Sequence, residues 1–493
     1  MNPIYLDYAA TTPIDARVAE AMAPWVTAAP GAAMVRQFGN AASTHAYGQA
    51  ARAAVEHARA QVAALVNATP AGVVFTSGAT ESNNLVIHGM AHRRGAPRGQ
   101  TPHLVTTRIE HKSVLDACKA AQKSGAEVSY VDAGPDGRVG PDDIRAALRP
   151  NTVLVSVMHA NNETGVIQPV AAIGALCRER GIALHVDAAQ SVGKIPLDLA
   201  ALPIDLLSLA AHKIYGPQGI GALLVRAELR QVLAPLIHGG GHEHGLRSGT
   251  LPVHQIVAFG AAAALAARER AAEAPRLAAL RDRLQAALLA LPGTLLNGHP
   301  TERLPGLCNV SFPGLDGESL MSGLPELAVS SSAACNSESV EPSYVLLSLG
   351  RDAATAEASV RFSIGRFTTP AEVDVAIAAV TRAVRWQRER LPPTPGAPAA
   401  AGGTRVRFDL AVEQGRIVHA AYRALGCPGT HAACEWLCQR LIGQNVSQPS
   451  VGGPGEWREA LGIPANRLGR LLVVQDALNS ALAATKTPAQ ANT

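Results

Sequence analysis

The chain lacks several features that common protein classes need. No run approaches the roughly 18 uninterrupted apolar residues of a membrane span, and the start, MNPIYLDYAATTP, has neither a basic nor an apolar leader region. Its 43 Lys and Arg residues nearly balance 39 Asp and Glu residues, so no strong positive field favours nucleic acid or an anionic membrane. We therefore expect a cytoplasmic protein with no membrane or nucleic-acid partner.

Cysteines and aromatic residues are also scarce. Seven cysteines, an odd number in 493 residues, argue against a disulfide framework, so a conspicuous cysteine is a candidate for reactivity or metal binding. Aromatic residues make up 4% of the chain and hydrophobic residues 47%, which predicts a core of small aliphatic side chains. A chain of this length is expected to hold two or three domains.

Short apolar runs alternate with Ala-rich and Leu-rich helical stretches between about residues 50 and 230. Continuously apolar strands separated by helices predict an α/β fold with a mainly parallel, seven-stranded sheet covered on both faces. The runs lie at residues 72–76, 103–107, 128–131, 152–157, 183–187, 204–208 and 221–225.

The character of the chain changes twice after this region. A long helical stretch at 255–291 precedes mixed β and α patterns, which predict a smaller α+β domain. A Pro/Ala/Gly linker then separates a C-terminal α+β domain, with strands expected at 405–412 and 417–425. The expected divisions are a large domain at about 15–255, a small domain from the N-terminal segment and about 256–390, a linker at 391–403, a domain at 404–485, and a frayed tail at 486–493.

Four expected strand ends carry polar residues that could take part in chemistry, the last of them at 158–165 with 108–112 supplying amide and imidazole groups to the same edge. The segment 77–84 is a small-residue turn into a helix, whose free N–H groups could bind a phosphate, although a small-residue helix cap explains the segment equally well. Asp187 could pair with a protonated ring nitrogen or cap a helix. Lys213 ends an apolar run, where an amine suits Schiff-base chemistry, the alternative being a side chain that reaches the surface.

Together these groups match the needs of pyridoxal 5'-phosphate. Lys213 would hold the aldehyde, Asp187 would keep the ring nitrogen protonated, and His111 would lie against the ring face. The other expected contacts are Gln190 and Asn162 to the phenolic oxygen, and Ala79, Thr80 and His212 to the phosphate.

Five motifs closely resemble those of the cysteine desulfurases of the NifS/IscS kind, over about residues 1–390. The resemblance implies the aminotransferase class V fold and a homodimer in which Thr250 reaches the neighbouring subunit's cofactor phosphate. It also implies that Arg361, with Asn162, binds the substrate carboxylate. The motifs are YLDYAATTP at 5–13, TSGATES at 76–82, HKIYGP at 212–217, the segment from GGGHE to RSGT at 239–250, and RFSIGRF at 361–367.

One position departs from this family's pattern. Ala210 stands where the family usually has a phosphate-binding Ser or Thr, three positions before the lysine. Loss of one hydroxyl donor is expected to weaken cofactor binding by about 1–2 kcal/mol, without abolishing activity.

Cys335 lies in a small, polar segment, VSSSAACNSES, that is typical of a mobile loop rather than of a core element. By resemblance, its thiolate attacks the sulfur of L-cysteine, which leaves a persulfide on the enzyme and releases alanine, with His111 as an acid or base near the substrate thiol. Cys118, Cys177 and Cys308 fall in helical or strand patterns and are expected to be small core residues.

The C-terminal region resembles, more weakly, the U-type scaffold proteins on which iron–sulfur clusters are assembled. The resemblance rests on GRI at 415–417, ALGCPGT at 424–430 and QDAL at 475–478. Of the three cysteines and one aspartate that the family uses as ligands, only Cys427 remains. Gly402, Thr404 and Arg470 stand at or near the other positions, so ordinary scaffold function is in doubt.

Cys427, His431, Cys434 and Cys438 are spaced four, three and four residues apart, which places them on one stripe of a helix. This stripe, with Cys335 as a further ligand, could hold a soft metal or an iron–sulfur cluster, or it could relay a persulfide. The alternative is a helix that packs small residues inward, because a stripe of about 16 Å cannot surround one ion.

The residues predict a pyridoxal-phosphate site, and the family resemblance implies an L-cysteine desulfurase that donates sulfur to an iron–sulfur scaffold or another acceptor protein. Two alternatives remain open. One is a selenocysteine lyase or another class V enzyme. The other is an assembly protein whose C-terminal domain recruits sulfur acceptors.

Overall fold

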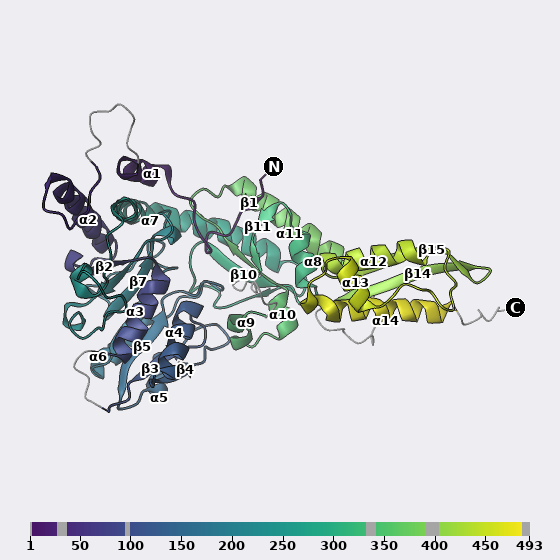
Figure 1. The fold of residues 1–493 in the computed structure, drawn as a ribbon, viewed down its shortest axis with the longest axis horizontal. Coiled ribbons are helices and arrows are strands. Elements are labelled where there is room, and N and C mark those ends of the chain that lie inside the picture. The colour runs from purple at the N-terminus through teal and green to yellow at the C-terminus, as the bar shows by residue number, and fades with distance from the viewer. Residues whose placement is uncertain (1, 27–36, 94–98, 332–341, 391–403, 486–493) are drawn as a thin grey trace.

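The computed structural model describes residues 2–26, 37–93, 99–331, 342–390 and 404–485. A seven-stranded sheet has the order β2-β8-β7-β6-β5-β3-β4, in which β8 is antiparallel to both neighbours and the other strands are parallel (Figure 1). The mainly parallel sheet is confirmed, and each strand lies within two residues of its expected position. The strands are β2 (Val73–Thr76), β3 (His103–Thr107), β4 (Glu127–Val131), β5 (Thr152–Met158), β6 (Ala183–Asp187), β7 (Leu206–Ala210) and β8 (Gly221–Val225).

Both faces of this sheet are buried. Alternate strand residues such as Val74 and Phe75 enter two different apolar cores. One core includes α2 (Ala46–Leu65), α5 (Pro141–Ala147), α6 (Val170–Glu179) and the first half of α7 (Val253–Leu289), and the other includes α3 (Ala79–Ala91) and α4 (Lys112–Lys123). This double covering explains why the strands are apolar along their whole length.

A second sheet, with the order β12-β13-β10-β9, forms a separate apolar core. Helix α7 joins the two cores, because its second half packs with α11 against the smaller sheet. The elements are β9 (Leu295–Leu296), β10 (Leu307–Ser311), β12 (Ser330–Ser331), β13 (Ser359–Ser363), α8 (Gly317–Ser322), α9 (Tyr344–Ser348), α10 (Ala353–Glu357) and α11 (Pro370–Arg390), with β1 (Ile4–Tyr5) paired to β11 (Leu327–Ala328) and α1 (Ala16–Met22) against α7.

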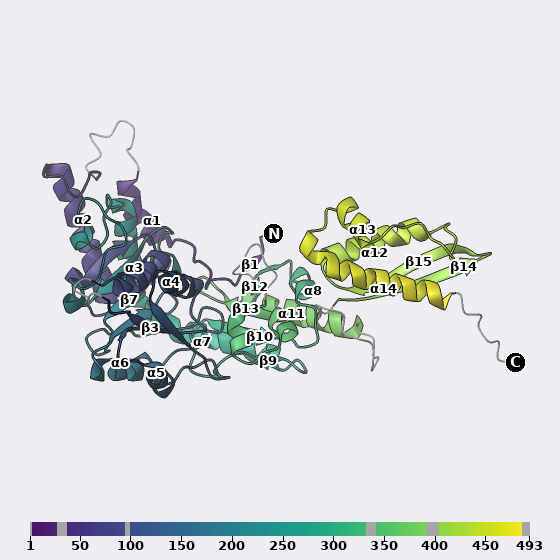
Figure 2. The ribbon, with the colours of Figure 1, turned by 60° about the horizontal axis from the view of Figure 1, so that its bottom comes forward.

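The C-terminal unit, residues 404–485, has its own core around the buried Trp457. It consists of an antiparallel hairpin with three helices, and its turn uses Gly415 at a φ of 77°, a conformation that favours glycine. Figures 1 and 2 place this unit at one end of the molecule, beyond α8 and α11. Its elements are β14 (Arg405–Glu413), β15 (Arg416–Leu425), α12 (Pro428–Leu441), α13 (Pro454–Ala460) and α14 (Leu468–Ala484).

A buried polar contact joins the C-terminal unit to α8. Arg470 donates to Asp316 Oδ1 at 3.0 Å and to Thr404 Oγ1 at 3.3 Å, and Arg467 pairs with Glu318. The Ser319 hydroxyl bonds both the N–H and the carbonyl of Gly426. The Asp316 carboxylate is almost fully buried, so Arg470 supplies the positive charge that its burial requires.

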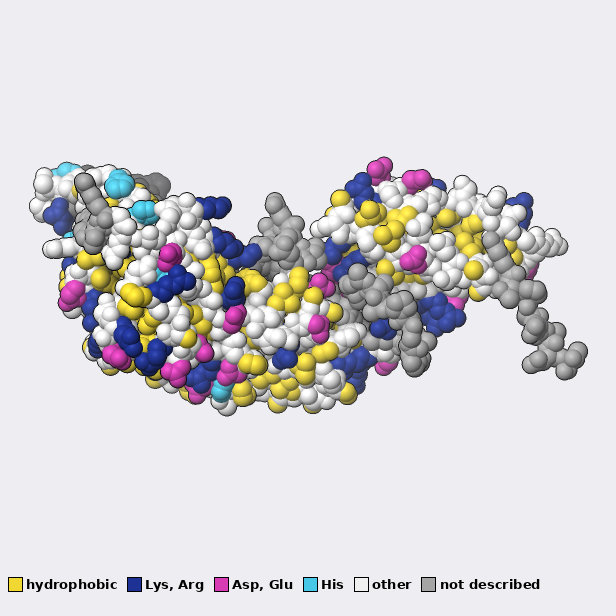
Figure 3. All heavy atoms as spheres, turned by 90° about the horizontal axis from the view of Figure 1, so that it is seen from below, with side chains coloured by type: hydrophobic (Ala, Val, Ile, Leu, Met, Phe, Trp, Pro, Cys, Tyr) yellow, Lys and Arg dark blue, Asp and Glu magenta, His cyan; other side chains and the backbone are white. Residues whose placement is uncertain are grey.

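The surface agrees with the balanced composition. Basic and acidic side chains are interspersed over the face drawn in Figure 3. Within the described part of the chain, no helix has the length and apolar character needed to cross a membrane.

Candidate active site

The carboxyl ends of the parallel strands open onto one recess, as expected for an open α/β sheet. Five of the residues predicted from the sequence line it, and they come from both sheets: His111, Asn162, Gln190, Lys213 and Arg361. The recess therefore combines groups that are far apart in the chain.

Lys213 lies in a short 3-10 turn, Ala211–Lys213, directly after β7. Its Nζ donates to the carbonyl oxygens of Ala9 and Ala10, at 2.6 and 2.7 Å. The N-terminal segment thus holds the amine at the wall of the recess.

Asp187 ends β6 and is 6% exposed. Its Oδ2 accepts from Asn83 Nδ2 at 2.7 Å, and its Oδ1 accepts from the N–H of Ala189 at 2.9 Å. Asn83 is fully buried in α3 and also donates to Ser113. Sequence reasoning missed the role of Asn83 in orienting this carboxylate, although an asparagine within an apolar helix was an available signal.

Arg361 projects from β13 and is held by three acceptors. Its guanidinium donates to the Asn162 carbonyl at 2.9 Å, to Asp7 Oδ1 at 2.7 Å and to Ser330 Oγ at 2.8 Å. Its Nε and the Asn162 side-chain oxygen are buried without a hydrogen-bond partner among the described residues. A ligand carboxylate beside this guanidinium could accept from Nε.

His111 is the N-cap residue of α4, and its Nδ1 lies 2.8 Å from Ser113 Oγ. Desolvation in the recess lowers the pKa of His111, Asp187 opposes this effect, and Lys213 adds to it. The imidazole is therefore predominantly neutral near pH 7, able to accept or donate a proton.

Ala79 and Thr80 begin α3, whose N-cap residue, Gly78, makes no side-chain cap hydrogen bond. A Cβ at Gly78 would meet nothing within 4 Å, so the approach to this helix end is open. His212 lies beside Thr11, with 3.1 Å between Nδ1 and Oγ1, and Ala210 is buried at the end of β7.

Among the other predicted residues, Thr250 does not line the recess and is exposed after the turn Glu243–Gly245. Cys335 lies outside the described residues. Cys434 and Cys438 are buried in the core of the C-terminal unit, as the inward-packing alternative expects, and Cys427 is 5% exposed at the start of α12. Among the described residues, no three His, Cys, Asp or Glu side chains are grouped to hold a metal. Metal binding at this stripe stays a prediction.

The three cysteines expected to be structural are buried in apolar cores: Cys118, Cys177 and Cys308. Burial raises the pKa of Cys118 to about 12 and of Cys308 to about 11. These thiols are therefore protonated and poorly nucleophilic.

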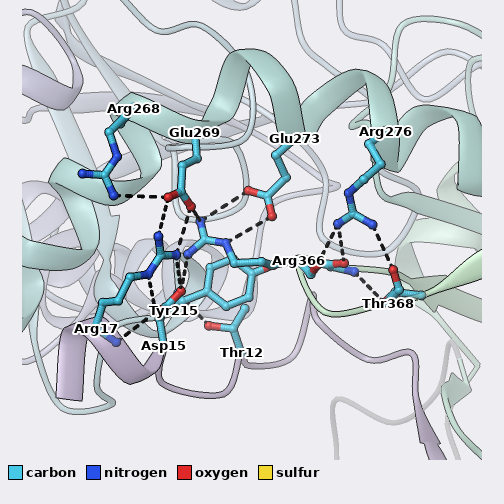
Figure 4. Close-up of polar contacts among 11 residues, drawn as sticks. Thr12, Asp15, Arg17, Tyr215, Arg268, Glu269, Glu273, Arg276, Arg366 and Thr368 are labelled. Atoms are coloured by element: carbon cyan, nitrogen blue, oxygen red, sulfur yellow. Dashed lines mark hydrogen bonds and ion pairs between the residues drawn. The ribbon is translucent and has the colours of Figure 1, made fainter. Parts of the chain in front are cut away.

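Beside the recess, a polar network joins the small sheet to the large one (Figure 4). Arg366, just after β13, donates to Asp15 Oδ2 at 2.7 Å and to Glu273 Oε1 at 3.2 Å. Its guanidinium carbon lies 4.3 Å from the centre of the Tyr215 ring, two residues after Lys213. This network fixes β13 relative to the turn that carries Lys213.

Comparisons with known proteins agree with this architecture. The aminotransferase class-V family model matches residues 4–375. Cysteine desulfurase IscS of Dechloromonas aromatica is 51% identical over 391 residues, covering 79% of this chain and 94% of that protein. The IscS of Aeromonas hydrophila is 52% identical, with coverages of 79% and 95%. The C-terminal unit lies outside the family match.

Solved structures are similar as well. A NifS-like protein, 33% identical, superposes with a TM-score of 0.70 and covers 78% of this chain and all of its own. DndA of Streptomyces lividans, 42% identical, has a TM-score of 0.62, with coverages of 73% and 99%. The chain belongs to the aminotransferase class-V family and, within it, to the cysteine desulfurases.

This family depends on pyridoxal 5'-phosphate, and the recess fits that group. The open N-terminus of α3 suits a phosphate, and the buried Asp187 carboxylate suits a protonated ring nitrogen. Lys213 supplies an amine in the recess that Arg361 also lines. The unpartnered Arg361 Nε and Asn162 Oδ1 are further polar atoms that a bound ligand would satisfy.

Proposed function

We propose that this recess converts L-cysteine into L-alanine and that the released sulfur is held as a persulfide on Cys335. The balance is L-cysteine plus a Cys335 thiol giving L-alanine plus a Cys335 persulfide. The observation that carries the proposal is the placement of Lys213 and Arg361 on the walls of one recess.

Each end of the substrate has a partner in this chain. The Arg361 guanidinium, fixed by Asp7, Ser330 and the Asn162 carbonyl, binds the carboxylate. When bound, pyridoxal phosphate withdraws electrons from the carbon that bears the amino group. Lys213 Nζ removes the proton from that carbon.

His111 acts at the substrate thiol. Because its pKa is lowered, its neutral ring can take the thiol proton near pH 7 and later return a proton. The Cys335 thiolate attacks the substrate sulfur, so that the carbon–sulfur bond breaks and the sulfur–sulfur bond forms. Ser330 and Ser331, which line the recess, precede the segment that carries Cys335.

The product sulfur passes to an acceptor protein, and iron–sulfur cluster assembly is the use proposed for it. The IscS relatives and the sequence resemblance of the C-terminal region to scaffold proteins support this proposal. The homodimer, the reach of Thr250 across it, the domain boundaries and the cytoplasmic location stay predictions.

The proposed function is tested by alanine release from L-cysteine under reducing conditions. Wild-type protein loaded with pyridoxal phosphate is expected to turn over, whereas Lys213→Ala and Cys335→Ser are expected to lose turnover. The Cys335→Ser variant is expected to keep the cofactor, which its absorbance would report. Faster turnover of L-selenocysteine, with Cys335 dispensable, would instead favour the lyase alternative.

A further inference from the structure

Lys194 is a basic group beside the recess that the proposed chemistry does not use. Its Nζ donates to Gln190 Oε1 at 3.2 Å. It lines a largely apolar cavity behind the recess, and Lys213 lines the same cavity. Lys194 is partly buried, and withdrawing an amine from water is costly unless polar groups such as Gln190 receive its hydrogen bonds.

The contact determines how the Gln190 amide is oriented. Gln190 Nε2 donates to the Ala9 carbonyl at 2.8 Å while Oε1 accepts from Lys194. A flipped amide would place its NH2 against the ammonium and its oxygen against the Ala9 carbonyl. Lys194 and Ala9 therefore select one orientation between them.

The Ala9 carbonyl also accepts from Lys213 Nζ at 2.6 Å. The two lysines are thus connected through Gln190 and Ala9 by consecutive hydrogen bonds. Gln190 itself lines the recess, and only one of its two amide hydrogens is used by Ala9.

We propose that Lys194 is a positioning residue: it holds the Gln190 amide with its Nε2 donor facing the recess and places a positive charge behind it. Such an arrangement favours a ligand oxygen that carries negative charge. The inference rests on the proposed function for the identity of that oxygen, which would be the phenolic oxygen of pyridoxal phosphate.

Several charges act on Lys194. Burial lowers its pKa to about 7, Lys213 and Arg361 lower it further, and Glu273 opposes them. Arg270 and Arg366 also line the cavity. The charge behind Gln190 is therefore sensitive to pH in the range where the enzyme would work.

The test is a pH titration of the cofactor absorbance in the full-length protein loaded with pyridoxal phosphate. Lys194→Met removes the charge, Lys194→Arg keeps it, and Lys119→Met removes an exposed lysine from the outer side of α4 as the matched control. We expect Lys194→Met to raise the apparent pKa of the absorbance change by about one unit, because the deprotonated oxygen loses its nearby cation.

Two further measurements separate positioning from folding. Lys194→Met is expected to lower kcat several-fold with a smaller change in KM, and Lys194→Arg is expected to restore most of the titration. The affinity of the cofactor-free protein for inorganic phosphate is expected to stay unchanged, which also reports correct folding. If Lys194→Met does not fold, Lys194→Gln takes its place in the titration.

The inference would be overturned if Lys194→Met kept the wild-type apparent pKa of the absorbance change, or if Lys194→Arg failed to restore it. Either result would leave the proposed function intact. A wild-type protein with no cofactor absorbance would overturn the proposed function first. The two failures are therefore distinguishable in one set of spectra.

Discussion

The main-chain N–H of Arg366 donates a hydrogen bond to the Tyr215 hydroxyl at 2.6 Å, while the Arg366 guanidinium covers the same ring. Tyr215 follows Lys213 by two residues, and Arg366 follows Arg361 by five. The pair thus joins two elements of the site. One is the turn that carries Lys213, and the other is the strand β13 that carries Arg361. Tyr215 has a φ of 67°, unusual for a residue other than glycine, which indicates that its surroundings enforce this position.

Tyr215→Phe removes the hydroxyl and keeps the ring. The Arg366 N–H then loses its acceptor in a part-buried site, so we expect a loss of about 1–3 kcal/mol of stability. We also expect a raised KM for L-cysteine, because Arg361 and Lys213 lose a fixed spacing. Thermal unfolding and steady-state kinetics measure both effects. Tyr130→Phe, which loses an exposed hydrogen bond to Gln122, is the control, and equal behaviour of the two variants would contradict this account.

Arg366→Met removes the hub of the polar network. Breaking a mostly buried ion pair leaves Asp15 and Glu273 without this cation, so we expect a loss of about 3–5 kcal/mol. Arg268→Met, which removes an exposed partner of Glu269, is expected to cost about 1 kcal/mol or less. Chemical denaturation of both variants provides the comparison, and similar midpoints would refute the proposed importance of the buried network.

Asp15 adds a pH dependence to the same network. Arg17 and Arg366 hold the pKa of Asp15 well below its usual value, against the opposing effect of its burial. A depressed carboxyl pKa contributes stability above the unfolded pKa of about 4, and this contribution is lost as the pH falls further. Between pH 6 and pH 2, the free energy of unfolding is therefore expected to fall less in Arg366→Met than in the wild type. Unfolding measured across this pH range tests this.

The buried Glu110 carboxyl changes stability with pH in the opposite direction to Asp15. Burial raises its pKa to about 8, although Thr107 and the Met158 N–H donate to its Oε1. The folded state therefore holds a proton that the unfolded state releases above about pH 4.3, so stability falls as the pH rises from there to about 8. Glu110→Gln should lack this fall. Melting temperatures of both proteins between pH 5 and pH 9 test this, and parallel curves would contradict it.

Much of the site could be predicted because it sits at strand ends. Continuous apolar runs located the strands, and parallel strands bring their carboxyl ends to one edge, so His111, Asn162, Gln190 and Lys213 could be grouped from the sequence alone. Arg361 comes from the other sheet, and only the family resemblance pointed to it.

The sequence pattern could not predict residues whose roles depend on tertiary contacts. Asp7 binds Arg361 from 354 positions away, which no local periodicity encodes. The bond from Asn83 to Asp187 depends on how α3 packs across the sheet. Lys194 follows Gln190 by four residues, but its contact depends on a cavity that α7 closes from the other side.

The C-terminal unit should separate from the rest of the chain when its ion pair is broken. Arg470→Gln leaves the buried Asp316 carboxylate without this cation, so we expect limited proteolysis to release the C-terminal unit faster. Asp316→Asn in the same chain should recover part of the loss, since the unpaired charge is gone. Arg407→Gln, which breaks an exposed pair with Asp409, is the control, and equal cleavage in the two single variants would refute the contact.

The central claim is that sulfur from L-cysteine is held on Cys335. The most direct measurement incubates the protein, loaded with pyridoxal phosphate, with L-cysteine, traps persulfides by alkylation and locates the added sulfur by peptide mass spectrometry. The account predicts added sulfur on Cys335 and none on the buried Cys118, Cys177 and Cys308; sulfur on Cys427 as well would make the C-terminal unit an internal acceptor. Cofactor-loaded protein that carries no added sulfur on Cys335 would contradict the account.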